Sequence, residues 1–274
     1  AEGWAATPAE TRAAVLDRAA ELLHARRFEA AAWMVFEVGK TWTEAQGDLM
    51  ETIDYLRFYA REARRIYGRN RRRDYPGEMN EYFYQPRGVV AVIGPFCFPM
   101  ALIAGMTAAA LVTGNTVIMK PARAASVCGA KLAEVLIEAG LPPGVLNFVP
   151  GHGKQLGECP VKHSGVDLIA FTGSREVGCR IIENARYVQP GETSFKHVIA
   201  EMGGKNAIIV DDDADIDEAV QATIASAFGY SGQKCTACSR VIVLADVYKD
   251  YLSKLVEAAR GIKPASSELP GTTV

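Results

Sequence analysis

The chain has 274 residues, of which 49% are hydrophobic and 23% charged, and its net charge is −2. This composition is typical of a globular protein, and the length suits one large domain or one and a half. The near-neutral charge argues against wholesale nucleic-acid binding, and no apolar run approaches the roughly 18 residues that a membrane helix needs. Six cysteines, mostly in apolar segments, indicate a reducing compartment, and we expect the cytoplasm.

The first 67 residues are predicted to be helical. The segment Thr7 to Glu10 has the form of a capping box with proline at the first helical position. Further helices are expected at 29–38 and at about 43–67, where apolar residues recur at helical spacing. An exposed connection should follow the last of these helices. Six arginines lie between Arg64 and Arg73, and a solvated helix end is favoured there over a polyanion site.

From residue 89 onward, short β-branched runs alternate with helical segments. Strands are expected at 89–93, 116–119, 145–149, 167–171, 196–199 and 206–210. This alternation is typical of βαβ units, and runs such as VVAVI are apolar throughout, as in strands covered on both faces. We therefore predict an α/β fold with a Rossmann-like parallel sheet and helices on both of its faces, preceded by an N-terminal helical segment. Ligands of such sheets bind at the carboxyl ends of the strands.

Four motifs that follow strands or helices are candidates for a site. Ser174 is placed as a helix N-cap whose free amides can hold a phosphate, although most such turns are only well-capped helices. Lys120 ends a strand and can hold a ribose or a phosphate, or simply reach solvent. Glu201 ends another strand before two glycines, as a general base or merely a loop acid. Cys235, beside Lys234, is either a reactive thiol or a small core hydrophobe.

Together these motifs resemble the aldehyde dehydrogenase superfamily. The segments FTGS, EMGGKN and GQKC occur in the family's order, GPFCFP is a variant of its Pro-Trp-Asn-Phe-Pro loop, and NTVIMKPA also resembles a family segment. The likeness covers essentially the whole chain. Longer stretches such as YPGEMNEYFYQPRGV and SAFGYSGQKCTACSR are closer still to the 1-pyrroline-5-carboxylate (L-glutamate γ-semialdehyde) dehydrogenases.

The resemblance implies a role for each motif. Cys235 would be the nucleophile that adds to an aldehyde, and Glu201 would activate the water that hydrolyses the resulting thioester. An NAD(P) cofactor would accept the hydride, and no metal is expected. The residues implied to hold the cofactor are Gly94, Pro95, Phe96, Lys120, Arg123, Gly173, Ser174 and Gly203. Those implied to contact the substrate are Glu51, Phe98 and Thr236.

The chain departs from the family pattern at two of these positions. Cys97 stands where the oxyanion loop has asparagine, and a thiol is a poor hydrogen-bond donor, so we expect a slow enzyme. Cys97 and Cys235 should both face the reacting carbon, and a reversible disulfide between them is a second hypothesis. Arg123 stands where the family often has an acid that binds the adenosine ribose. This exchange makes NADP an alternative to the favoured NAD, because the acid would repel a 2′-phosphate.

The resemblance also implies how the chain is organised. Residues 1–201 should form the NAD(P)-binding domain with its N-terminal helices, and 68–86 a protruding segment used for subunit contacts in a homo-oligomer. Residues 202–274 should be the start of a catalytic domain. We expect the chain to be a fragment that lacks the family's start and C-terminal part and is inactive alone.

The favoured function is oxidation of glutamate semialdehyde to glutamate with NAD in proline or arginine breakdown. The alternatives are an aldehyde dehydrogenase for another semialdehyde and a relative that binds a cofactor without catalysis.

Overall fold

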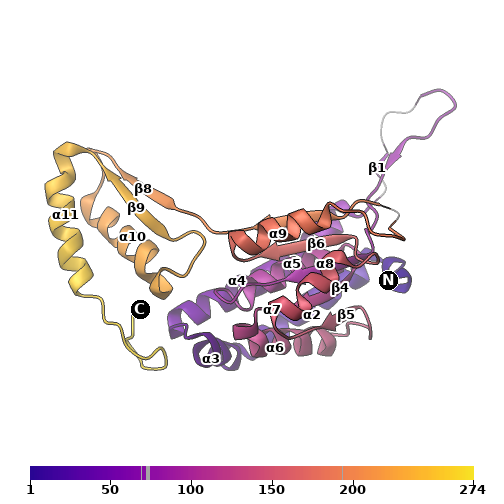
Figure 1. The fold of residues 1–274 in the computed structure, drawn as a ribbon, viewed down its shortest axis with the longest axis horizontal. Helices are drawn as coiled ribbons and strands as arrows, with labels where there is room; N and C mark the ends of the chain where they lie inside the picture. Colours follow the sequence, from indigo (N-terminus) through magenta and orange to yellow (C-terminus); the bar gives the residue numbers. More distant parts are fainter. Residues whose placement is uncertain (69, 72–74, 193) are drawn as a thin grey trace.

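The structure, a computed structural model, describes residues 1–68, 70–71, 75–192 and 194–274. A large part with a central sheet is joined to a smaller part that contains the C-terminus (Figure 1). The helices are α1 (Glu2–Ala5), α2 (Ala9–Ala25), α3 (Arg27–Val38), α4 (Trp42–Ile66), α5 (Ala101–Val112), α6 (Ser126–Glu138), α7 (Gly153–Leu156), α8 (Glu158–Lys162), α9 (Arg175–Ala185), α10 (Ile216–Phe228) and α11 (Ala245–Arg260), with 3-10 turns η1 (Arg123–Ala125) and η2 (Gly229–Gly232). The strands are β1 (Asn70–Arg71), β2 (Glu81–Tyr82), β3 (Val89–Ile93), β4 (Thr116–Lys120), β5 (Leu146–Phe148), β6 (Leu168–Thr172), β7 (His197–Glu201), β8 (Asn206–Val210) and β9 (Cys238–Val243).

A five-stranded parallel sheet, in the order β5-β4-β3-β6-β7, lies at the centre of the large part. The chain enters at β3 in the middle, adds β4 and β5 on one side, and then crosses to β6 and β7 on the other. This doubly wound order places a topological switch point between the carboxyl ends of β3 and β6. The predicted α/β fold with a parallel sheet is confirmed, and each of these strands lies within two residues of its predicted bounds.

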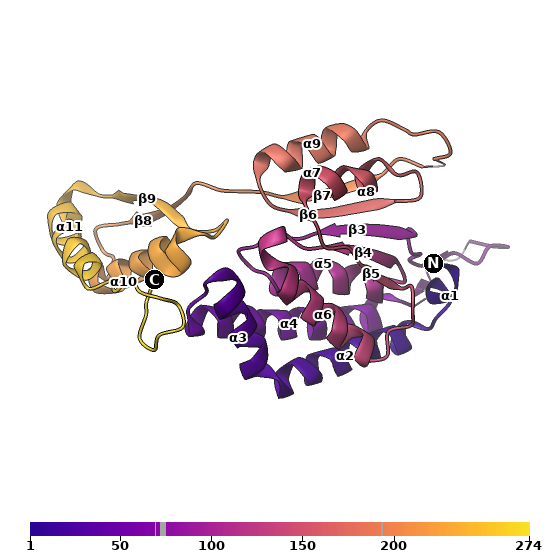
Figure 2. The same ribbon diagram turned by 60° about the horizontal axis from the view of Figure 1, so that its bottom comes forward.

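Helices cover both faces of this sheet (Figure 2). Val90 and Val92 of β3 join the main core, to which α2 to α6 contribute. Ala91 and Ile93 of the same strand pack in a second core with residues of α8 and α9. Because successive side chains of a strand point to opposite faces, a strand that is covered on both needs apolar residues at every position.

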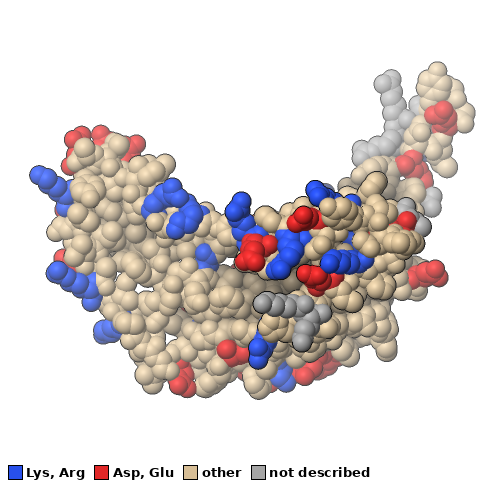
Figure 3. All heavy atoms as spheres, viewed as in Figure 1, with Lys and Arg blue, Asp and Glu red and all other residues tan. Residues whose placement is uncertain are grey.

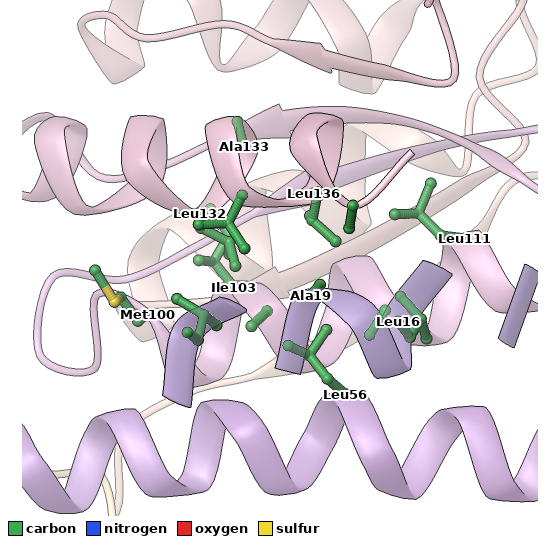
Figure 4. Close-up of a cluster of buried hydrophobic side chains, with 14 of the residues drawn as sticks. Leu16, Ala19, Leu56, Met100, Ile103, Leu111, Leu132, Ala133 and Leu136 are labelled. Atoms are coloured by element: carbon green, nitrogen blue, oxygen red, sulfur yellow. The ribbon is translucent and has the colours of Figure 1, made fainter. Parts of the chain in front are cut away.

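The N-terminal helices α2 and α4 form a further layer beneath α5 and α6. Figure 4 shows Leu16 of α2, Leu56 of α4, Ile103 of α5 and Leu132 of α6 converging on one cluster, and all four side chains are buried. Burying a leucine or isoleucine side chain contributes roughly 1.5–3 kcal/mol, so this layer is a large part of the fold's stability.

The capping box predicted at the start of α2 is wrong. The helix begins at Ala9, and the hydroxyl of Thr7 donates to the carbonyl of Gly3 at 3.0 Å. The carboxylate of Glu10 lies 2.8 Å from Arg64 of α4. The tertiary contact between two helices has therefore drawn the acid away from the backbone amide that it would have capped.

The described residues between 68 and 86 project from this layer as an arm (Figure 1). In it β1 and β2 pair antiparallel, Asn70 with Tyr82 and Arg71 with Glu81. Exposed aromatic side chains, among them Tyr75, lie on the arm. Residues 69, 72 and 73 of the predicted arginine-rich stretch lie outside the described residues. The use of the arm in subunit contacts stays a prediction.

The smaller part contains a two-stranded parallel sheet of β8 and β9. Val210, Val220 and Tyr251 form its core with α10 and α11, and the hydroxyls of Tyr251 and Thr223 lie 2.8 Å apart. On the strands themselves, Ile209 is 74% exposed. Residues 202–205 connect β7 to β8, so the predicted domain division after residue 201 falls at this connection and remains an inference.

Lysines and arginines lie interspersed with acidic residues on the face shown in Figure 3. Among the described residues, no helix is both long and apolar enough to span a membrane.

Candidate active site

A cavity of about 980 Å³ lies at the carboxyl edge of the sheet, at the switch point between β3 and β6. Its walls include residues that follow β3, β4 and β6, the inner side of α9, and residues 232–235 of the smaller part. The volume is at the upper end of the range for small-molecule and cofactor sites. Because both parts of the molecule contribute, their relative position determines the shape of the cavity.

Most of the predicted site residues line this cavity together, although they are far apart in the sequence. They are Gly94, Pro95, Phe96, Cys97, Lys120, Arg123, Gly173, Ser174, Gly203 and Cys235. The cavity therefore gathers the predicted nucleophile and every residue predicted to hold the cofactor. The individual roles of these residues remain proposals.

Glu201, the predicted general base, lies just outside this lining. It ends β7, its backbone carbonyl accepts a hydrogen bond from the amide of Gly173 at 3.1 Å, and the residues that follow it, Met202 and Gly203, line the cavity. Its side chain is exposed. Glu201 therefore adjoins the cavity through its backbone and through the residues that follow it.

The three residues predicted to contact the substrate are also absent from the lining of the described cavity, but two of them adjoin its cysteines in the chain. Thr236 is exposed and follows Cys235. Phe98 follows Cys97 and packs its ring 4.0 Å from the ammonium of Lys40. Burial raises the pKa of Tyr55, and the charges of Glu51 and Cys235 add to the rise, so both residues lie within electrostatic range of this tyrosine.

Lys120 places a buried cation at the end of β4. The residue is 5% exposed, and its ammonium donates to the carbonyl of Pro121 at 3.2 Å. Burial lowers its pKa, because removal from water disfavours the charged form. An anionic or hydroxyl-bearing ligand in the cavity would restore the interactions that this ammonium has lost.

The turn from β6 into α9 directs the start of that helix toward the cavity. Ser174 caps the helix by accepting from the amide of Val177 at 3.4 Å, as predicted. Gly173 is required before it, since an added Cβ would lie 2.6 Å from the ring of Phe171. Free amides and the positive end of the helix dipole at this position favour a phosphate.

The two cysteines of the cavity differ in their surroundings. Cys235 is exposed, whereas Cys97 is half-buried. Burial raises the pKa of the Cys97 thiol, the nearby Cys235 raises it further, and the charge of Lys40 acts in the opposite direction. The thiol at position 97 therefore stays protonated near neutral pH.

A strained turn precedes Cys235. Tyr230 (φ 51°) and Ser231 (φ 54°) adopt the left-handed conformation, which costs roughly 1–2 kcal/mol for a residue other than glycine. Tyr230 is buried and its hydroxyl donates to the carbonyl of Val38 at 2.7 Å. Close by, Lys234 pairs with Glu44 at 2.7 Å. These contacts with the N-terminal helices hold the turn that brings Cys235 to the cavity.

The profile of the aldehyde dehydrogenase family matches residues 1–274. The chain belongs to the aldehyde dehydrogenase family. Among curated relatives, the 1-pyrroline-5-carboxylate dehydrogenase of Geobacillus thermodenitrificans is 51% identical over 257 residues, which are 94% of this chain and 50% of that protein. That of Bacillus subtilis is 47% identical over 271 residues, 99% of this chain and 53% of that protein. The chain thus spans about half the length of these relatives.

Solved structures share the fold of this chain. The 1-pyrroline-5-carboxylate dehydrogenase from Thermus with bound NAD has a TM-score of 0.95 and 44% identity, over 97% of this chain and 52% of that one. Proline utilization A from Bdellovibrio bacteriovorus, inactivated by N-propargylglycine, has a TM-score of 0.97 and 49% identity, and the match covers 99% of this chain and 28% of that one. The predicted aldehyde dehydrogenase fold is confirmed.

This aldehyde dehydrogenase chain also has cavity residues that the sequence analysis missed. Arg180 and Asn184 of α9 line the cavity with Val177, and His152 does so from the segment after β5. The spacing of 177, 180 and 184 is that of one helix face, so helical periodicity counted from the cap at Ser174 could have found them. His152 offered no comparable signal.

Proposed function

We propose that the protein containing this chain oxidises glutamate semialdehyde, the open form of 1-pyrroline-5-carboxylate, to glutamate with NAD. The observation that carries the proposal is the thiol of Cys235 in one cavity with Lys120, Gly173 and Ser174. Relatives about half identical to the chain are named 1-pyrroline-5-carboxylate dehydrogenase, which supports this aldehyde over other semialdehydes.

The residues of the cavity fit a dinucleotide. The ammonium of Lys120 suits a ribose hydroxyl or a phosphate, and the start of α9 suits the pyrophosphate. The loop after β3 needs glycine at position 94, because a Cβ there would lie 2.9 Å from Ile103 of α5. When bound, the nicotinamide supplies the hydride acceptor.

The chemistry of this chain begins at Cys235. Its thiol loses a proton, the sulfur bonds to the aldehyde carbon, and the carbonyl oxygen becomes an alkoxide. After the hydride has left that carbon, the product is a thioester on Cys235. The carboxylate of Glu201, turned toward the thioester, takes a proton from water, whose oxygen then attacks the carbonyl and releases the thiolate and the acid.

Cys97 weakens the stabilisation of the alkoxide. The oxyanion loop offers a thiol in place of an amide, and this thiol stays protonated near neutral pH. Loss of one oxyanion donor costs on the order of 10²–10³ in kcat. We infer a dehydrogenase that is slow for its family, with the backbone amide of Cys235 as a remaining donor.

We infer NAD as the principal cofactor, with NADP tolerated. Arg123 lines the cavity after the strand that ends at Lys120, and its guanidinium would meet a 2′-phosphate favourably. Glu158 also lines the cavity, and it pairs with Lys162 at 2.9 Å, which lessens its repulsion of a phosphate.

The test is an assay of the full-length protein with 1-pyrroline-5-carboxylate and NAD, in which NADH and glutamate are both quantified. Equal amounts of the two products, lost in Cys235→Ala, are expected. Absence of NADH with the wild-type protein, or turnover that survives Cys235→Ala, would overturn the proposal. Faster oxidation of a shorter or longer semialdehyde would reject the substrate while retaining the reaction.

A further inference from the structure

An ion pair lies fully buried behind the loop that carries Cys97. The ammonium of Lys40, in the turn between α3 and α4, is 3.2 Å from the carboxylate of Asp48 on α4, and both side chains are 0% exposed. Among the described residues, neither Lys40 Nζ nor Asp48 Oδ2 has a hydrogen-bond partner of good geometry. A buried pair with unsatisfied atoms is costly for the stability of the fold.

The ammonium of Lys40 lies between two aromatic rings. Its nitrogen is 4.0 Å from the ring centroid of Phe98 and 4.7 Å from that of Tyr230. Both distances are within the range of a cation–π interaction, which is strongest where water is excluded. Phe98 is the neighbour of Cys97, and Tyr230 begins the left-handed turn that leads to Cys235.

The carboxylate of Asp48 fixes the other end of the same loop. Its Oδ1 accepts a hydrogen bond from the amide of Ala101, the first residue of α5, at 2.8 Å. The segment 97–101 is thus held at Phe98 by Lys40 and at Ala101 by Asp48. Burial raises the pKa of Asp48 to about 6, against the effect of Lys40, so the carboxylate is largely charged at neutral pH.

We propose that Lys40 is a positioning residue whose ammonium, paired with Asp48 and held between Phe98 and Tyr230, sets the separation of the two cavity cysteines. The Lys40 ammonium is the common contact of one segment from the large part and one from the smaller part. This role rests on the proposed function for its catalytic consequence, whereas the separation of the cysteines can be measured without turnover.

The test replaces both charges at once, because removal of one partner leaves the other buried and uncompensated and can unfold the protein. In Lys40→Met/Asp48→Asn the side chains keep their approximate volumes and the amide can still accept from Ala101. Replacing a whole buried ion pair by neutral side chains is often neutral for stability. The matched control is Arg26→Met/Glu138→Gln, which removes an exposed pair that links the end of α2 to α6.

Two measurements on the full-length protein test whether the pair sets the separation of the cysteines. In the first, bis-methanethiosulfonates of increasing length are reacted with Cys97 and Cys235, and the crosslink is quantified by mass spectrometry. The shortest reagent that couples the wild-type cysteines is expected to lose at least threefold in yield in the Lys40/Asp48 variant. The control variant should crosslink as the wild type does.

In the second measurement, kcat for the aldehyde should fall at least tenfold in the Lys40/Asp48 variant, with the KM for NAD within twofold of the wild-type value. Wild-type crosslinking lengths together with an unchanged kcat in a folded double variant would overturn the positioning role. If the wild-type protein shows no dehydrogenase activity, the proposed function fails, and the crosslinking result still decides whether the pair sets the separation.

A substitution that keeps the positive charge at position 40 tests whether the pair acts through that charge or only through the volume of the side chain. Lys40→Arg keeps a cation between the two rings and should retain most of the short crosslink, whereas the folded Lys40→Met/Asp48→Asn variant should not. Equal crosslinking in Lys40→Arg and in this double variant would show that the charge is dispensable, and the proposal would be wrong.

Discussion

The side-chain amide of Asn206 donates a hydrogen bond to the backbone carbonyl of Cys235, with 2.8 Å between the two atoms. Asn206 is the first residue of β8, at the end of the connection that leaves Glu201. The backbone of Gly204 in that connection also lies close to the same carbonyl. The position of the sulfur therefore depends directly on the segment that follows the proposed general base.

Gly204→Ala should impair catalysis, because a Cβ at this position would lie only 2.8 Å from the carbonyl oxygen of Cys235. The backbone at Cys235 must move, and a misplacement of about 1 Å at a reacting group can cost roughly 100-fold. We expect kcat to fall roughly 10–100-fold in steady-state assays of the full-length protein. Gly47→Ala, on an exposed and open part of α4, is the control and should be neutral. Wild-type kcat in Gly204→Ala would show that this contact relaxes freely.

Cys97→Asn should raise kcat at least about tenfold, because the amide restores a donor to the developing alkoxide. The gain should appear in kcat more than in the KM for the aldehyde, since the donor acts on charge that is absent from the ground state. Cys97→Ser provides a comparison in which a smaller donor replaces the thiol. An unchanged rate in Cys97→Asn would mean that the loop does not contact the oxyanion.

Iodoacetamide at pH 7 should modify Cys235 well before Cys97. Cys235 is exposed, whereas burial and the neighbouring Cys235 raise the pKa of the Cys97 thiol above its usual 9.0. Only the thiolate is alkylated, so labelling of Cys97 should increase as the pH rises through and above that value. Peptide mass spectrometry over time measures both sites. Preferential labelling of Cys97 at pH 7 would contradict this assignment.

Mild peroxide should produce a disulfide between Cys97 and Cys235, which line one cavity. Peroxide oxidises the Cys235 thiolate to a sulfenic acid, and the Cys97 thiol then displaces water to form the S–S bond. Cys238, buried three positions after Cys235, is a competing partner. Mapping by mass spectrometry distinguishes the two products. If no 97–235 crosslink forms while Cys235 is oxidised, the hypothesis is rejected.

Arg123→Glu should shift the cofactor preference of the protein toward NAD and away from NADP. A carboxylate in place of the guanidinium would repel a 2′-phosphate, so the Kd for NADPH should rise by about tenfold or more relative to that for NADH. Fluorescence titration of the full-length protein gives both constants. Arg186→Glu, at the end of α9 and outside the cavity lining, is the charge-matched control. An unchanged ratio of the two constants would place Arg123 away from the 2′ position.

Much of the fold could be predicted because its signals are local. The apolar runs of the central sheet give strands at the expected places, and Ser174 caps α9 as its sequence context indicates. The box at Thr7 failed because Glu10 pairs with Arg64, a partner 54 residues away that no local pattern shows. Local rules therefore hold where the competing tertiary contact is weak.

The candidate site likewise combines residues that could be placed from the sequence with residues that could not. Residues that follow parallel strands meet at one edge by topology alone, which is why Lys120 and Gly173 could be placed together. The ion pair of Lys40 and Asp48 could not be predicted in this way, because its contact depends on how α3 and α4 pack. One signal was present: Asp48 lies on the face of α4 that buries Ala45 and Leu49, and an acid on such a face requires a partner.

The exposed isoleucines of the β8–β9 sheet affect how this chain behaves when it is produced by itself. Ile209 and Ile242 are 74% and 53% exposed on strands that can still accept further backbone hydrogen bonds at their edges. In the chain by itself such a surface can pair with extended polypeptide, including further copies of the chain, so aggregation of the isolated chain should rise steeply with its concentration. Dilute expression in the cold, where attraction between apolar surfaces weakens, should keep more of the material dispersed.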